Sequence, residues 1–238
     1  CNVAIGFERL FARELGVDPA QVELDHVGLN HLSWELGVRV RHADGTATEV
    51  LDTLLGAHGA ALEAETELPL ALMRSERSIP SYYLRYFWEH DALVERASSA
   101  PSRATEVASI ERELLELYAD PTLAEKPALL TRRGGAFYSE AAIGLLASLL
   151  GTGPARDHVV NVRNHGTLPF LDAEAVIETR AHVSAGTVHV HPAPAVPPLA
   201  AGLIAHVARY EQLGIDAALH GGRERVARAL LAHPLVGQ

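Results

Sequence analysis

Residues 22–41, VELDHVGLNHLSWELGVRVR, alternate apolar and polar side chains in two patches on either side of Gly28. A period of two is typical of a strand, because successive side chains of a strand point to opposite faces of the sheet. The pattern therefore predicts two strands joined by a tight turn at the central Gly28. Three later segments are short and rich in valine, which favours strands of a small sheet; they are VVNVRNHG, AVIETRAHV and TVHVHPAPAV.

Much of the remaining chain has helical spacing. Phe7, Leu10, Phe11 and Leu15 recur at intervals of three and four ahead of Gly16, which predicts an amphipathic helix over residues 4–15. Further helices are expected at residues 49–62, 67–74, 82–88, 105–120, 139–150, 198–219 and 222–236, and the aromatic-rich helix at 82–88 is expected to be buried. No repeat or low-complexity linker interrupts this order. We therefore expect one α+β domain over residues 1–238, with helices outnumbering strands.

Composition excludes several classes of partner. The formal charge of -10 argues against nucleic acid, because phosphate binding needs a basic stripe that this sequence lacks. No run approaches the roughly 18 consecutive apolar residues of a membrane span, so we expect no membrane partner. The single cysteine allows no disulfide within the chain and suits a reducing cytoplasm. An anionic substrate would have to be held by a few local arginines.

Two motifs carry weak signals. GTGPAR at residues 151–156 begins like a dinucleotide fingerprint, but Arg156 replaces the third glycine and the motif follows a helix, so a surface turn is the favoured interpretation. His189 and His191 would share one face of a strand near His182, an arrangement that can bind a metal. Because no third ligand is evident, exposed strand histidines are the favoured interpretation.

Three further residues are candidates for chemistry. Cys1 and His31 each lie beside an asparagine, and by themselves they are compatible either with a site or with a buried cysteine and an ordinary strand histidine. Tyr138, in RRGGAFY ahead of an apolar helix, could cap the core or act as a base. A tyrosine acts as a base only when its pKa falls well below about 10, which needs a nearby cation or metal. Arg132 and Arg133 supply positive charge close by in sequence.

Six motifs taken in order resemble glycoside hydrolase family 4, specifically its 6-phospho-β-glucosidases. They are CNVAIG, GLNHLSW, IPSYYLRYFW, RRGGAFYSEAA, VVNVRNHG and the closing YEQLGIDAAL with RALLAHPLV. The resemblance covers only the C-terminal part of such an enzyme, and the abrupt start at Cys1 agrees with a fragment whose N-terminal NAD-binding Rossmann domain is absent. The implied fold is helix-rich with small, mostly antiparallel sheets, similar to the C-terminal domain of lactate and malate dehydrogenases. In the family, Cys-Asn-Val/Ile-Pro goes with 6-phospho-β-glucosidases; here Ala4 replaces the proline.

The resemblance implies a redox mechanism rather than the two-carboxylate scheme of most glycosidases. NAD⁺ takes hydride from C3 of the sugar, a base removes the acidified proton on C2, the aglycone leaves C1, water adds, and C3 is reduced again. By resemblance, Cys1 and His31 bind a divalent metal, usually Mn²⁺, and Tyr138 is the base that removes the C2 proton. The backbone freedom of Gly134 and Gly135 would bring Tyr138 against the sugar.

The resemblance also implies substrate contacts, partners and location. Asn2 and Asn30 would bind sugar hydroxyls, and Arg133 a sugar oxygen or the 6-phosphate. The substrate would be a phosphorylated disaccharide or an aryl-glucoside, in a cytoplasmic homodimer or homotetramer, and the isolated fragment would be inactive. Two alternatives stay open. One is a family 4 α-glycosidase, and the other is a non-catalytic oligomerisation module that uses residues 79–88 and the terminal helices as its interface.

Overall fold

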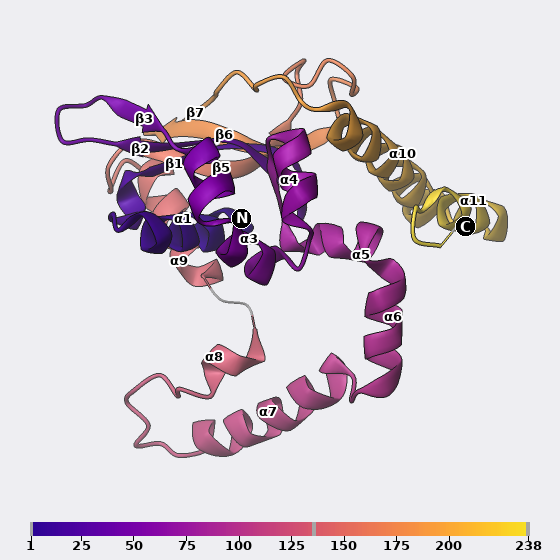
Figure 1. Cartoon of the computed structure of the whole chain (residues 1–238). Helices are drawn as coiled ribbons and strands as arrows, with labels where there is room; N and C mark the ends of the chain where they lie inside the picture. Colours follow the sequence, from indigo (N-terminus) through magenta and orange to yellow (C-terminus); the bar gives the residue numbers. More distant parts are fainter. Residues whose placement is uncertain (1, 135–136, 237–238) are drawn as a thin grey trace.

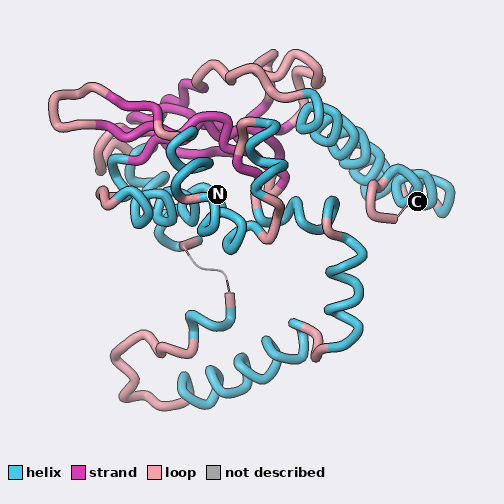
Figure 2. Tube along the Cα trace, in the orientation of Figure 1, coloured by secondary structure: helices cyan, strands magenta, loops and turns pink. Residues whose placement is uncertain are grey.

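A computed structural model describes residues 2–134 and 137–236, and in these ranges seven antiparallel strands form one sheet (Figures 1 and 2). The main path is β3-β2-β1-β6-β5, with β4 paired to β2 and β7 paired to β6. The bounds are β1 Val22–Leu29, β2 Leu32–Arg41, β3 Ala47–Glu49, β4 Ile79–Pro80, β5 Arg156–Arg163, β6 Val176–Ser184 and β7 Thr187–Val190. The expected antiparallel pairing is confirmed. The early hairpin and the late valine-rich strands are, however, parts of one sheet rather than separate small sheets.

The two halves of the sheet meet over a short stretch. Strand β1 pairs with β6 at Val27↔Thr179 and Gly28↔Glu178. The expected turn at Gly28 is wrong: Gly28 lies inside β1, and the turn falls at Asn30 and His31. Gly28 has another role, because a Cβ there would lie 2.2 Å from the carbonyl oxygen of Leu32. The glycine therefore permits close approach of the returning strand.

Helix α1, Asn2–Leu15, confirms the first predicted helix and packs its Phe7, Leu10 and Phe11 against the sheet. The segment expected as one helix at 49–62 is instead two, α2 Leu51–Ala57 and α3 Gly59–Thr66, which meet at His58. A Cβ on Gly59 would lie 2.2 Å from the side chain of Leu70, the first residue of α4 Leu70–Glu76. The absence of a side chain at Gly59 thus lets Leu70 of α4 pack closely on α3.

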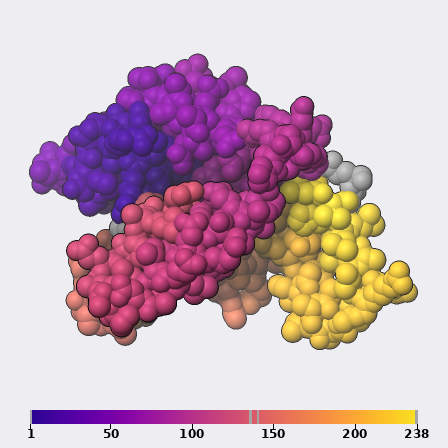
Figure 3. Space-filling view, turned by 90° about the horizontal axis from the view of Figure 1, so that it is seen from below, coloured from indigo at the N-terminus to yellow at the C-terminus, as the bar shows by residue number. Residues whose placement is uncertain are grey.

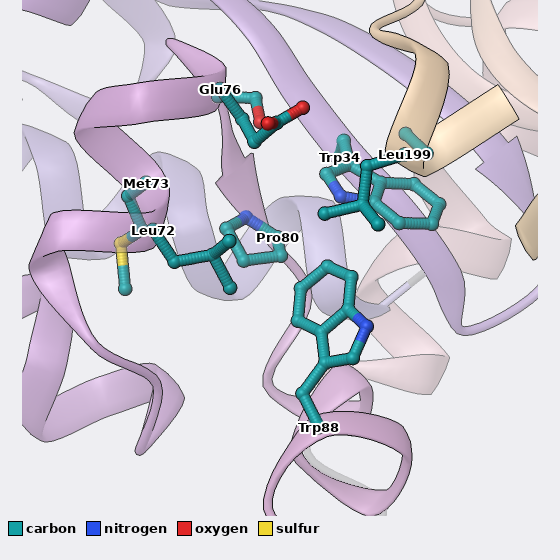
Figure 4. Close-up of a pocket in the computed structure, with 9 residues that line it drawn as sticks. Trp34, Leu72, Met73, Glu76, Pro80, Trp88 and Leu199 are labelled. Carbon is teal, nitrogen blue, oxygen red and sulfur yellow. The ribbon is translucent and has the colours of Figure 1, made fainter.

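The aromatic segment 82–88 is a short 3₁₀ turn, Tyr82–Leu84, followed by α5 Arg85–Trp88, rather than one buried helix. Leu84 is fully buried, whereas the ring of Tyr86 is 42% exposed. Trp88 lies 6.3 Å from Trp34 of β2, and the two rings line a small pocket with side chains from α4 and from the start of α10 (Figure 4). This contact holds the aromatic segment against the sheet.

The chain then leaves the body as an arm, residues 90–133, which contains α6 His90–Ser99, α7 Arg103–Tyr118 and α8 Leu130–Arg133 (Figure 1). From below, the arm is the pink region beside the yellow C-terminal helices (Figure 3). Helix α9, Tyr138–Leu149, returns to the body and packs Leu145 and Leu149 on β5 and β6. The turn expected at residues 151–156 is confirmed, with Arg156 as the first residue of β5.

The C-terminal pair, α10 Pro198–His220 and α11 Arg223–Ala232, projects from the edge of the body (Figure 1). Leu219 and Leu231 are each 73% exposed there. Across 2–134 and 137–236, no helix is both long and apolar enough to cross a bilayer.

Candidate functional site

His31 lies in the turn between β1 and β2, with a left-handed backbone φ of 67°. Its imidazole stacks face to face on the ring of Tyr83, with 4.3 Å between centroids and 5° between planes. Within the described ranges no hydrogen bond reaches its ring nitrogens, and the residue is only partly buried. A histidine nitrogen that is accessible and uncommitted is a suitable metal ligand, so His31 fits the expected divalent cation. Its expected partner ligand, Cys1, lies outside the described residues.

One tyrosine of the aromatic segment, Tyr83, contacts this histidine, and two others lie next to Tyr83. The ring of Tyr83 lies 4.4 Å from that of Tyr82 and 6.4 Å from that of Tyr86. Burial, followed by the neighbouring Tyr83, raises the pKa of Tyr82, and Tyr138 adds to the effect. Among the described residues, Tyr138 affects Tyr82 electrostatically but makes no ring contact with His31 or Tyr83. Sequence reasoning missed Tyr83, because an aromatic run was taken as core.

Tyr138 is the first residue of α9 and is 52% exposed. The residue before it, Phe137, has a left-handed φ of 67°, and the guanidinium of Arg9 lies 4.2 Å from the centre of its ring. A contact of this kind is a cation–π interaction and links α1 to the start of α9. Gly134 has a φ of 93°, so the backbone freedom expected of this glycine is used; Gly135 lies outside the described residues.

The other predicted substrate residues are spread over three elements. Asn2 begins α1, and Asn30 is exposed in the same turn as His31. Arg133 ends α8, where its guanidinium pairs with Glu111 of α7 at 3.1 Å. Both partners of that ion pair are about half exposed, so the pair is weak and Arg133 could exchange it for a substrate oxygen. The turn at residues 30–31 is thus the part of the site that the described residues define best.

A buried charged cluster lies below this turn. The imidazole of His26 lies between two carboxylates, with Nδ1 2.7 Å from Glu35 Oε1 and Nε2 2.8 Å from Glu178 Oε1. All three side chains are fully buried. Burial alone would lower the pKa of His26, but Glu35 and Glu178 raise it to about 9. His26 is therefore an imidazolium at neutral pH, held between the two carboxyl groups.

Glu8 of α1 is close enough to this cluster to be affected by its charge. Burial, and then the negative charge of Glu35, raise the pKa of Glu8 to about 7, against the opposing effect of Arg156. The pKa of Glu8 is higher in the folded protein than in the unfolded chain. The free energy of unfolding therefore falls as the pH rises from about 4.5 to about 7. Ionisation of Glu8 therefore destabilises the packing of α1 above neutral pH.

Replacing Glu8 by glutamine should stabilise the protein at pH 8 by about 1–3 kcal/mol, because the amide carries no charge to bury. At pH 4.5 the carboxyl is protonated in the folded wild type, so the two proteins should unfold at nearly the same temperature. Thermal unfolding of both proteins at the two pH values measures the difference. Equal unfolding temperatures at pH 8 would show that Glu8 carries no such penalty.

A second set of charges covers the strands beside this cluster. Arg180 of β6 pairs with Glu23 at 2.9 Å and donates to Asp157 at 2.7 Å. Asp157 also contacts His182 at 2.8 Å and His191 at 3.1 Å. Burial opposes its ionisation, but these partners lower the pKa of Asp157 to about 2. Among the described residues no three His, Cys, Asp or Glu side chains come together as a metal site, and His182 and His191 are partners of Asp157 on a partly exposed surface.

The profile of the family 4 glycosyl hydrolase C-terminal domain matches residues 26–236. The chain belongs to this family. It is 35% identical over 235 residues to the 6-phospho-beta-glucosidase of Thermotoga maritima. The alignment covers 99% of this chain and 55% of the relative. A probable 6-phospho-beta-glucosidase of Bacillus subtilis is 31% identical over 99% of this chain and 54% of its own length. This family 4 domain therefore spans about half the length of these curated relatives.

Solved structures of the family agree with the fold. The Thermotoga maritima enzyme with NAD and glucose-6-phosphate superposes with a TM-score of 0.87 at 34% identity, over 99% of this chain and 55% of that one. The same enzyme with manganese, NAD⁺ and glucose-6-phosphate gives a TM-score of 0.88 at 35% identity. A 6-phospho-alpha-glucosidase from gut microorganisms gives 0.79 at 20% identity, which shows the fold alone. The predicted α+β, helix-rich class is confirmed for this family 4 domain.

Proposed function

We propose that the polypeptide carrying this chain is an NAD- and Mn²⁺-dependent 6-phospho-β-glucosidase, and that residues 1–238 are its C-terminal metal-binding and oligomerisation domain. The observation that carries the proposal is the similarity over 99% of the chain to the Thermotoga maritima 6-phospho-beta-glucosidase, at 35% identity. The relative that acts on the α-anomer is only 20% identical. The nucleotide-binding domain would lie in another part of the polypeptide. A cytoplasmic homodimer or homotetramer remains part of the proposal.

The residues of this chain have distinct tasks in that reaction. When bound, NAD⁺ accepts and returns a hydride, and the metal polarises the sugar oxygens. His31 would hold the metal with Cys1, and Asn2, Asn30 and Arg133 would orient the sugar and its phosphate. A tyrosine phenolate would take the proton from C2 of the sugar. Tyr138 is the candidate from the sequence, and Tyr83 is a second candidate because its ring lies directly on His31.

Hydrolysis of an aryl 6-phospho-β-glucoside and of its α-anomer tests the proposal. The complete polypeptide is assayed with NAD⁺, Mn²⁺ and a thiol reductant, and each is omitted in turn. We expect turnover of the β-anomer that disappears without NAD⁺ or without the metal. Turnover of the α-anomer alone, or of an unphosphorylated sugar alone, would support a family 4 glycosidase but contradict the proposed 6-phospho-β-glucoside substrate. No turnover of any sugar would contradict the enzyme.

The C-terminal helices favour a second role for the isolated chain, as an oligomerisation module. Leu219 of α10 and Leu231 of α11 are each 73% exposed, and the neighbouring Leu230 is 49% exposed. Several large apolar side chains exposed on one projecting pair of helices favour an interface there. Both roles are compatible in one polypeptide. Sedimentation of the chain at several concentrations tests this role, and a monomer at every concentration would contradict it.

A further inference from the structure

The buried cluster of His26, Glu35 and Glu178 joins three strands at one point. His26 belongs to β1, Glu35 to β2 and Glu178 to β6, and the imidazole contacts both carboxylates. Asn161 of β5 also donates to Glu178, at 3.4 Å. The second oxygen of Glu35, Oε2, is buried and has no hydrogen-bond partner among the described residues. A cluster of this kind is strongly directional, since any shift of one strand leaves a buried charge unpaired.

Two residues of the cluster, His26 and Glu35, lie in the same hairpin as His31, three residue pairs before the turn. In the hairpin, His26 pairs with Glu35, and three further pairs, from Val27↔Trp34 to Leu29↔Leu32, lead to the turn. The pairing of β1 with β6 is confined to Val27 and Gly28, next to His26. Because this backbone pairing is short, the His26–Glu178 contact is a large part of what fixes the end of β1 on the second half of the sheet.

Position matters for His31 because its backbone is held in a sparsely populated conformation. A left-handed φ of 67° at a residue with a Cβ costs free energy and persists only where the surrounding structure enforces it. The register of β1 on β2 supplies that constraint. A hairpin that is looser at His26 and Glu35 would allow the turn to relax and would move the imidazole off Tyr83.

We propose that His26 is a positioning residue for His31: held between Glu35 and Glu178, it fixes the end of the hairpin and so sets the affinity of the turn for a divalent cation. The inference rests on the proposed function, in which His31 is a metal ligand. It assigns a task in the site to a residue that touches neither metal nor sugar. It also explains why a costly charge is buried in the sheet close to the site rather than replaced by apolar side chains.

The test is Mn²⁺ affinity, measured from the electron paramagnetic resonance signal of free Mn²⁺ during titration of the protein. His26→Gln keeps a hydrogen-bond donor but removes the positive charge. We expect its dissociation constant for Mn²⁺ to rise by about tenfold, as for other residues that orient a metal ligand. The double variant His26→Gln with Glu35→Gln also removes one of the two carboxyl groups that the lost imidazolium faced, and should recover most of the affinity. Glu178→Gln, a milder change, serves if His26→Gln does not fold.

Val183→Ala is the matched control, because Val183 is fully buried near the other end of β6, five residues along the strand from Glu178. It should lower the unfolding temperature without changing Mn²⁺ affinity. The inference is overturned if His26→Gln lowers the unfolding temperature but binds Mn²⁺ as the wild type does. The variant His31→Ala tests the metal-ligand role of His31 separately from the positioning role of His26. Equal Mn²⁺ binding by His31→Ala and wild type, or none by the wild type, would remove the metal assignment and this inference with it.

Discussion

Phenylalanine in place of Tyr83 is expected to lower kcat on an aryl 6-phospho-β-glucoside by about 10²–10⁴-fold, the usual contribution of a general base. The ring of Tyr83 is stacked on His31, so the phenol belongs to the side chain that directly covers the proposed metal ligand. A nearby cation favours the phenolate and so favours proton abstraction. Phenylalanine keeps the stacked ring and removes only the oxygen that would accept the proton.

Tyr138→Phe and Tyr86→Phe complete the comparison. Tyr86 lies in the same aromatic segment with a 42% exposed ring, so its variant should retain wild-type kcat. A sugar deuterated at C2 identifies the base, because loss of the base makes proton abstraction rate-limiting and increases the isotope effect. If Tyr138→Phe shows the large loss and Tyr83→Phe does not, then the base is Tyr138, as the sequence indicates.

The sequence predicted the helices and strands of the fold better than the turns and breaks between them. The period of two in residues 22–41 identified both strands, since burial of one face imposes that alternation. The turn was misplaced because glycine at position 28 was assigned to a turn, whereas it is required by the close approach of Leu32. At 49–62 the predicted single helix is interrupted at His58, and Gly59 directly after it accommodates Leu70, a contact that no local pattern encodes.

The sequence can propose a site residue where one motif carries it, as for His31 in GLNH, and the role of His31 as a ligand stays a prediction. The site was not predictable where partners come from distant segments. Tyr83 is part of an aromatic run that composition assigns to the core, and only the folded chain brings it to His31. His26 likewise has the pattern of a polar strand residue, and its second partner, Glu178, is 152 residues away. A charged side chain can be buried only beside such a partner, so sequence periodicity alone could not identify His26 as a buried charge.

Replacing Arg180 by methionine is expected to destabilise the protein by about 3 kcal/mol. The guanidinium is only 13% exposed and lies among three carboxylates, with Glu23 at 2.9 Å, Asp157 at 2.7 Å and Asp25 at 3.7 Å. Methionine matches the volume of the side chain but leaves these carboxylates facing one another with less positive charge. Glu23 and Asp157 belong to β1 and β5, so the loss falls on the short junction between the halves of the sheet.

The pH dependence of this loss distinguishes electrostatics from packing. Asp157 has a pKa of about 2 in the wild type, below its usual 3.8, so its contribution to stability is present above about pH 4 and is lost as the pH falls towards 2. Without Arg180 the Asp157 carboxylate takes up a proton more readily, and the difference between variant and wild type should shrink as the pH falls from 7 to about 3, inside the window in which the contribution of Asp157 is lost. Urea unfolding at both pH values gives the free energies.

Arg163→Met provides the control, since Arg163 of β5 pairs with Glu174 while both side chains are more than 60% exposed. An exposed pair contributes at most about 1 kcal/mol, so this variant should unfold almost as the wild type does. The buried position of Arg180, rather than its charge alone, is what makes the expected effect larger. A loss at Arg180 as small as that at Arg163, or one that is independent of pH, would mean that packing and not the ion pairs holds the two halves of the sheet together.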